Sequence, residues 1–189
     1  MKIILASASP RRRELMKLIT DDFTAVSIDA DETLPDEIGG ITNASEYLAR
    51  IKAEKAHEMF PDDIVIGCDT IVVHDNKILG KPKDKEQARE YLRMLSCDVH
   101  GVFTGCCIMC RDKCVWFNEG TDVFFDKISD EEIEDYISTD EPYDKAGGYG
   151  IQGRGALFVN KINGDFFNVM GLPVSRLNKE LKKFIKGVR

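Results

Sequence analysis

The chain has 189 residues, of which 43% are hydrophobic and 31% are charged, and its formal net charge at pH 7 is −7. This length predicts a single domain over residues 1–189, large enough to bury roughly 70% of its unfolded surface and to form a core. The acidic balance disfavours stable nucleic-acid binding, and the short apolar runs disfavour a membrane helix and a secretory signal, so we expect a cytoplasmic protein.

The first predicted elements are a strand, a turn and a helix. An apolar run over residues 2–6 predicts a buried strand. Ser9 is a good N-cap and Pro10 a good first helical residue, so a helix is expected from there to about residue 19. Loose alternation over residues 23–28 predicts a second strand, and the acidic segment 29–41 is expected to be a loop.

The next elements are a longer helix and the strongest predicted strand. Asn43 and Glu46 have capping-box spacing and predict a helix that ends near residue 60. The apolar stripe expected along this helix consists of Leu48, Ile51, Lys55 and Met59. Residues 64–73 are expected to form a strand, followed by a hairpin turn and a loop.

The second half of the chain continues the mixture of helices and strands. A helix is expected over residues 84–96, then two long strands over 99–110 and 114–125, then a helix from the capping box at Ser129 to about residue 138. Residues 141–155 are expected to lack regular structure, and a strand over 156–162 and a helix over 173–185 complete the chain. Parallel-looking and hairpin strands mixed with helices predict an α/β fold with a mixed sheet.

A cluster of positive charge surrounds the first turn. Residues 1–20 contain five basic side chains and one acidic side chain, although the rest of the chain is acidic. Arg11 and Arg12 fall in the first helical turn, where they oppose the helix dipole, and Ser7 adds a hydroxyl donor. A bound phosphate would relieve that repulsion. The alternative is a capped surface helix with solvated arginines, and the local pattern favours neither.

Asp69 is an isolated carboxylate inside the predicted strand 64–73. A bare carboxylate in an apolar strand is costly unless it is paired or bound to a cation. Gly67 lies two residues away on the same face and is expected to leave room beside it. Such a carboxylate next to phosphates can hold Mg²⁺ or take a proton from water. The alternative is a structural Asp that backbone donors or an arginine satisfy.

Three further side chains are candidates for ligand contacts. Lys81 follows a strand end, and Lys55 lies on the apolar stripe of its helix, so its ammonium must leave the core or meet an anion; for both, the alternative is a solvated lysine. Residues 148–153 match GxGxxG, but a strand follows them instead of a helix, which excludes a Rossmann site. Gln152 in this stretch can donate and accept hydrogen bonds at once, which suits a base edge; the alternative is an ordinary glycine turn.

Two other kinds of site are disfavoured. Four of the six cysteines lie between residues 106 and 114. Strand positions three apart face opposite sides, so these cysteines are expected to be buried or half-buried free thiols in preference to a zinc site. The sequence has no GxxxxGK[ST] motif, so it is not a P-loop enzyme.

Together these segments resemble the Maf family of nucleotide pyrophosphatases, in a match that runs nearly from end to end. It rests on LASASPRRREL, IGCDTIVV, ILGKP, EPYDKAGGYGIQGRG and FFNVMGLPVS, in this order. The second motif usually has Gly or Ala before its Asp, so Cys68 is a mild departure. The resemblance implies a fold related to inosine-triphosphate pyrophosphatases, with an elongated mixed sheet and a central cleft. It also implies a homodimer that depends on a divalent cation.

The resemblance implies roles for individual residues as well. Asp69 looks like the proton acceptor and Glu32 like a second acidic residue, so both are candidate metal ligands. The implied phosphate-side residues are Ser7, Arg11, Arg12, Lys55 and Lys81. Arg11, Thr70 and Gln152 have the identities of the subgroup that prefers dTTP and UTP to 7-methyl-GTP.

The hypothesis from the sequence is therefore hydrolysis of dTTP and UTP, and of modified pyrimidine nucleotides, to the monophosphate and pyrophosphate. Asp69 orients or deprotonates a water that attacks the α-phosphorus, while basic side chains neutralise the triphosphate and Mg²⁺ or Mn²⁺ is shared by carboxylates and phosphates. Two alternatives stay open. One is a nucleotide-binding regulator of septum formation with little turnover, and the other is a pyrophosphatase for non-standard purine nucleotides.

Overall fold

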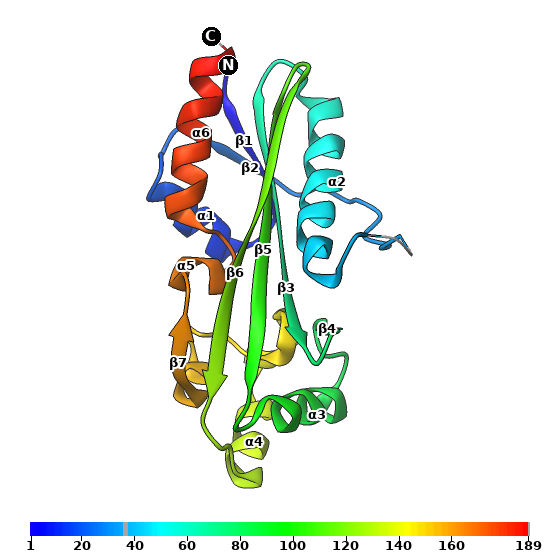
Figure 1. Ribbon diagram of the computed structural model, residues 1–189, viewed down its shortest axis with the longest axis vertical. Coiled ribbons are helices and arrows are strands. Elements are labelled where there is room, and N and C mark those ends of the chain that lie inside the picture. The colour runs from blue at the N-terminus through cyan, green and yellow to red at the C-terminus, as the bar shows by residue number, and fades with distance from the viewer. Residues whose placement is uncertain (36–37, 189) are drawn as a thin grey trace. The chain divides into compact units, whose positions relative to one another are not determined.

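The computed structural model describes residues 1–35 and 38–188, so residues 36 and 37 of the predicted loop 29–41 lie outside it (Figure 1). The strands are β1 (Ile3–Ala6), β2 (Thr24–Val26), β3 (Ile64–His74), β4 (Lys77–Leu79), β5 (Val99–Cys110), β6 (Lys113–Phe125) and β7 (Val159–Asn163). The α-helices are α1 (Pro10–Lys17), α2 (Ala44–Met59), α3 (Lys85–Leu95), α4 (Asp130–Ile137), α5 (Phe166–Val169) and α6 (Val174–Val188). The 3₁₀ turns are η1 (Ile41–Asn43), η2 (Glu141–Asp144), η3 (Ala146–Gly148) and η4 (Arg154–Phe158).

The strands form one mixed sheet in the order β2-β1-β3-β5-β6-β7, with β4 paired to β3. Strand β1 runs parallel to both β2 and β3, whereas β3–β4 and β6–β7 are antiparallel. The register of β1 on β3 places Ala6 opposite Gly67. The predicted α/β fold with a mixed sheet is therefore confirmed.

The residues group into two compact units. The first consists of Met1–Asp69, Thr104–Glu119 and Gly171–Arg189, and the second of Thr70–Phe103 and Gly120–Met170. Strands β3, β5 and β6 contribute residues to both. The prediction of a single domain over residues 1–189 stays a prediction.

Helix α2 packs closely on the sheet of the first unit because its inner face consists of small residues (Figure 1). Ala49, Ala53 and Ala56 are fully buried there, against Ile4 and Val65 among others. Of the predicted apolar stripe, Leu48 is buried as expected, but the rest is wrong, because Ile51 is only half-buried, Lys55 is exposed and Met59 is 61% exposed. A stripe of long side chains would hold the helix further from the sheet.

Gly67 has a different role from the one expected. A Cβ at this position would overlap the carbonyl oxygen of Ala49 and lie 2.7 Å from the backbone nitrogen of Ala53. The space beside Gly67 is therefore occupied by the backbone of α2 and is not room for a ligand. Gly67 is required for close approach of helix and strand.

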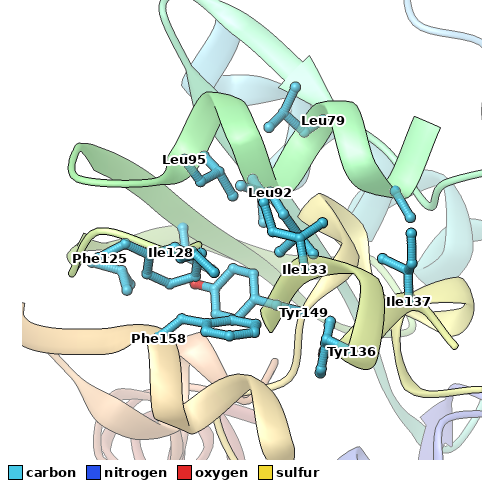
Figure 2. Close-up of a cluster of buried hydrophobic side chains, with 14 residues drawn as sticks. Leu79, Leu92, Leu95, Phe125, Ile128, Ile133, Tyr136, Ile137, Tyr149 and Phe158 are labelled. Atoms are coloured by element: carbon cyan, nitrogen blue, oxygen red, sulfur yellow. The ribbon is translucent and has the colours of Figure 1, made fainter. Parts of the chain in front are cut away.

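The core of the second unit is built around aromatic rings and aliphatic side chains from α3 and α4 (Figure 2). The ring centroids of Phe125 and Tyr149 lie 4.7 Å apart, and those of Tyr136 and Phe158 lie 5.0 Å apart, both edge to face. Such pairs add roughly 0.5–1.5 kcal/mol each to the stabilisation from burial. Tyr149 and Phe158 come from or beside the segment that was expected to lack structure, so this segment is anchored in the core.

Several local predictions are confirmed and others are wrong. Ser9 and Ser129 cap their helices as expected, and Ser129 forms a complete capping box with Glu132. Asn43 makes no capping hydrogen bond; its side-chain amide donates instead to the carbonyl oxygen of Ile38 (3.2 Å). The segment 141–155 contains η2, η3 and the start of η4 in place of an irregular loop, so β7 begins at Val159, later than predicted.

Candidate active site

The carboxyl end of β1 and the start of α1 form one part of the candidate site, in the first unit. Ser7 follows β1, is only 7% exposed, and its Oγ accepts a hydrogen bond from the backbone nitrogen of Ser9 (3.2 Å). The Oγ of Ser9 caps the helix by accepting from the backbone nitrogen of Arg12 (3.4 Å). The first turn has no acidic residue. The end of β1 therefore leads into a helix start with positive side chains and a favourable dipole for an anion.

The two arginines of this turn are held partly inside the protein. Arg11 and Arg12 are both half-buried. The Nε of Arg12 donates to the carbonyl oxygen of Gly171 at 2.8 Å, which fixes the direction of its guanidinium group.

Asp69 lies on β3 at 9% exposure and forms an ion pair with Lys52 of α2. The same ammonium contacts Oε1 of Glu32 at 2.9 Å, so two carboxylates meet at one cation. The side chains of Lys52 and Asp69 are 14% and 13% exposed, whereas Glu32 is 59% exposed. A carboxylate this far from solvent needs such a partner, and removing it would leave a buried charge.

The arginine turn and the Asp69 pair lie at neighbouring strands. Ala6 is opposite Gly67 in the parallel β1–β3 ladder, so Ser7 and Asp69 both lie just beyond this register position. Cys68, the residue before Asp69 on β3, is buried. Its pKa is lowered, first by a hydrogen bond from Cys106; burial opposes this, and the charges of Arg12, Asp69 and Lys52 all act on the thiol. Lys52, Glu32 and Asp69 therefore lie together, with Asp69 on the strand next to the one that leads to Ser7 and the start of α1.

Lys52 was missed by the sequence analysis, which named Lys55. The structure places Lys55 on the exposed side of α2, where its Nζ lies 2.9 Å from Oε2 of Glu58. The available signal was the alanine face formed by Ala49, Ala53 and Ala56, because small residues indicate the side of a helix that packs closely. Lys52 borders that face and Lys55 does not.

The other candidate residues belong to the second unit. Thr70 follows Asp69 on β3 and is half-buried. Lys81 is exposed just after β4, as predicted, and the loop around it is held by a hydrogen bond from the nitrogen of Gly147 to the carbonyl oxygen of Gly80 (3.0 Å). Gln152 is exposed in a turn closed by a hydrogen bond from the nitrogen of Gly153 to the carbonyl oxygen of Gly150 (3.1 Å).

Comparison with known proteins assigns the family. The family model described as Maf-like protein matches residues 2–184. The chain belongs to the Maf family. It is 47% identical over 189 residues to a dTTP/UTP pyrophosphatase of Bacillus cytotoxicus, covering 98% of this chain and 97% of the relative. It is 45% identical over 186 residues to a dTTP/UTP pyrophosphatase of Bacillus cereus, covering 97% and 95%. The resemblance of the sequence motifs to the Maf family is confirmed.

Solved structures show weaker likenesses. The Ham1 protein of Staphylococcus aureus matches with a TM-score of 0.47 at 16% identity, covering 66% of this Maf chain and 72% of that protein. A nucleoside-triphosphatase, dITP/XTP pyrophosphatase, of Mycobacterium abscessus matches with a TM-score of 0.43 at 17% identity, covering 68% and 76%.

A divalent cation suits a nucleotide pyrophosphatase of the Maf family in general, and the donor set of this chain fits one. Asp69 and Glu32 converge on a single ammonium, and carboxylate oxygens are the ligands that Mg²⁺ and Mn²⁺ prefer. Among the described residues, no group of three or more His, Cys, Asp or Glu side chains is arranged to hold a metal ion. Two protein carboxylates together with substrate phosphates are a usual way of holding Mg²⁺.

No helix in the described part of the chain has the length and apolar character to cross a membrane.

Proposed function

We propose that this chain hydrolyses dTTP and UTP, together with modified pyrimidine nucleotides, to the nucleoside monophosphate and pyrophosphate. The relatives at 45–47% identity that are named for this activity support the proposal. The observation that carries it is the ion pair of Asp69 with Lys52, next to the strand end that leads to Ser7 and the arginine turn. A low-exposure carboxylate beside donors for phosphate is the arrangement that hydrolysis of a phosphoanhydride needs.

Asp69 is the proposed proton acceptor. Its Oδ1 is held by the ammonium of Lys52, which fixes the carboxylate in one orientation. A water placed against the other oxygen, Oδ2, is oriented or deprotonated there and attacks the α-phosphorus. A bound divalent cation, Mg²⁺ or Mn²⁺, would neutralise phosphate charge, with Asp69 and Glu32 as the residues that hold it.

The remaining candidates bind the triphosphate or select the base. Ser7, Arg11, Arg12 and Lys81 donate to phosphate oxygens and neutralise the charge that develops on pyrophosphate as it leaves. We propose that Lys52 takes the role that the sequence assigned to Lys55, since Lys52 and not Lys55 contacts Asp69. The substrate-selecting residues in this proposal are Arg11, Thr70 and Gln152.

The test is product analysis with a nucleotide panel of UTP, dTTP, ITP, XTP and 7-methyl-GTP in the presence of Mg²⁺ or Mn²⁺. We expect UMP plus pyrophosphate from UTP and little turnover of the purine nucleotides. UDP plus phosphate would mean that a different bond is cut, and a preference for ITP or XTP would favour the purine alternative. Survival of UTP during prolonged incubation with tight binding would favour the regulator of septum formation.

The assembly and location belong to the same proposal. We propose a homodimer, as the family resemblance implies, and a cytoplasmic location, as expected from the short apolar runs of the sequence. Sedimentation equilibrium measures the first directly, with a mass of about twice the 21.3 kDa chain as the expected result. A single species with the monomer mass at micromolar concentration would contradict it.

A further inference from the structure

The turn that carries Gln152 lies outside every helix and strand of the second unit, yet it is firmly attached. Gly150 and Gly153 close the turn through a hydrogen bond of 3.1 Å, and Ile151 and Gln152 form its corner. Gln152 is exposed, whereas Gly150 and Gly155 on the two sides of the turn are buried.

One carboxylate, that of Glu141 in η2, holds both sides. Its Oε1 accepts from the backbone nitrogen of Gly155 (3.0 Å) and its Oε2 from that of Arg154 (2.9 Å), which fixes the exit of the turn. The hydroxyl of Tyr136 donates to Oε1 of Glu141 (2.9 Å) and accepts from the backbone nitrogen of Gly150 (3.3 Å), which fixes the entry. The turn is therefore tied at both ends to Glu141, directly on one side and through Tyr136 on the other.

The glycines of this stretch fit around the carboxylate. A Cβ at Gly153 would overlap the carboxylate of Glu141, and a Cβ at Gly150 would lie 2.7 Å from Cε of Lys145. Lys145 in turn donates to the carbonyl oxygen of Glu141 (2.8 Å). The GxGxxG pattern at residues 148–153 thus has a physical reason that is unrelated to dinucleotide binding, because its last two glycines let the turn lie against Glu141 and Lys145.

Tyr136 is well placed for its part in this arrangement. Its ring belongs to the buried cluster of Figure 2 and packs edge to face on Phe158, with a centroid distance of 5.0 Å. Burial alone would raise the pKa of Glu141, but the hydrogen bonds from Gly155, Arg154 and Tyr136 outweigh it and lower the pKa. Glu141 is therefore an ionised acceptor at neutral pH, which is the form that three donors require.

We propose that Glu141, with Tyr136 as its relay, is a positioning residue that sets substrate choice by holding the turn that presents Gln152 to the nucleotide base. The hydrogen bonds by which Glu141 and Tyr136 hold the turn are called the clamp below. The inference rests on the proposed function for the role of Gln152, but the clamp itself does not. A glutamine amide can form specific hydrogen bonds to a base edge only when its backbone is held in one place.

Four variants test this inference. Glu141→Gln keeps the size of the side chain but places an NH₂ group against a donor, and Tyr136→Phe keeps the ring and removes the relay hydroxyl. Gln152→Ala removes the proposed reader of the base. The matched control is Tyr143→Phe, which loses one hydroxyl hydrogen bond in the same unit, to the carbonyl oxygen of Ile137 (2.7 Å), a bond that involves neither Glu141 nor the turn.

The first readout is independent of activity. Hydrogen exchange at the backbone amides of Arg154 and Gly155 is expected to become at least about tenfold faster in Glu141→Gln, and that of Gly150 faster in Tyr136→Phe, with no change in Tyr143→Phe. Unchanged exchange at these amides in both variants would overturn the clamp. This readout holds whether or not the chain turns out to cleave nucleotides.

The second readout is the ratio of kcat/KM for UTP to that for CTP. We expect Glu141→Gln and Tyr136→Phe to lower this ratio about tenfold, mainly through the KM for UTP. Combining Glu141→Gln with Gln152→Ala should lower it no further than Gln152→Ala alone, because both act through one side chain. An unchanged ratio in the clamp variants or in Gln152→Ala, or additive losses in the double variant, would overturn the inference. Failure of the proposed function would instead appear as a wild-type protein without turnover.

Discussion

Replacing Lys52 by Met tests which of the two lysines of α2, Lys52 or Lys55, acts at the site. Met keeps the length and apolar stem of the side chain and removes the charge that faces Asp69 and Glu32. Because Asp69 and Lys52 are 13% and 14% exposed, Lys52→Met leaves a nearly buried carboxylate without its cation. Removing one partner of a buried pair costs about 3–5 kcal/mol, and the lower end applies here because Glu32 remains largely solvated.

Lys52→Met is expected to lower both the stability and the activity of the protein. A loss of about 3 kcal/mol lowers the melting temperature of a chain of this length by roughly 6–12 °C. Loss of a positive charge at the reacting phosphate lowers kcat/KM for UTP by roughly 10²–10³-fold. The control is Lys55→Met, because Lys55 is 54% exposed and its pair with Glu58 is worth about 0–1 kcal/mol.

Thermal unfolding and steady-state hydrolysis of UTP, measured for both variants, decide between the lysines. We expect Lys52→Met to be impaired in both assays and Lys55→Met to stay within about 2 °C and about twofold of the wild-type protein. If Lys55→Met loses activity while Lys52→Met retains it, the assignment of Lys52 to the site is refuted and the residue named from the sequence is restored.

Two further predictions concern stability. Gly67→Ala is expected to cost about 3 kcal/mol or more, measured by urea unfolding, because its Cβ would overlap the backbone of α2. Gly80→Ala, whose Cβ would meet nothing within 4 Å, is expected to be neutral, and equal losses in the two variants would contradict this account. Burial, reinforced by the charge of His74 and opposed by Asp98, lowers the pKa of His100 to about 4. As the pH falls, His100 is therefore protonated at a higher pH in the unfolded chain than in the folded protein. About 3 kcal/mol of stability that is present above pH 6.5 is lost as the pH falls to 4. His100→Asn should flatten this part of the urea-midpoint profile, and an unchanged slope would show that other groups cause it.

The parts of the fold that the sequence predicted well are those governed by local chemistry. Ser9, Pro10 and Ser129 mark helix starts through interactions within four residues, and the long hairpin of β5 and β6 shows continuous strand character. The position of Asp69 on a buried strand was visible for the same reason. These signals need no knowledge of tertiary neighbours.

The parts that were missed depend on distant contacts. The choice between Lys52 and Lys55 is set by which face of α2 meets the sheet, and the packing of its alanines against Gly67 decides this. The order in residues 141–155 comes from Glu141, which accepts hydrogen bonds from backbone groups 13 and 14 residues away. The first contact is indicated in the sequence only by the helical spacing of Ala49, Ala53 and Ala56, and the second leaves no periodic pattern.

Hydrolysis in water enriched in ¹⁸O tests the central proposal most directly, because it reports the phosphorus that is attacked. With UTP as substrate, attack by a water that Asp69 orients at the α-phosphorus places the label in UMP and leaves pyrophosphate unlabelled. Asp69→Asn should bind UTP but form the labelled UMP at a rate lower by orders of magnitude. Label in pyrophosphate, or labelled UMP formed by Asp69→Asn at nearly the wild-type rate, would contradict the proposal.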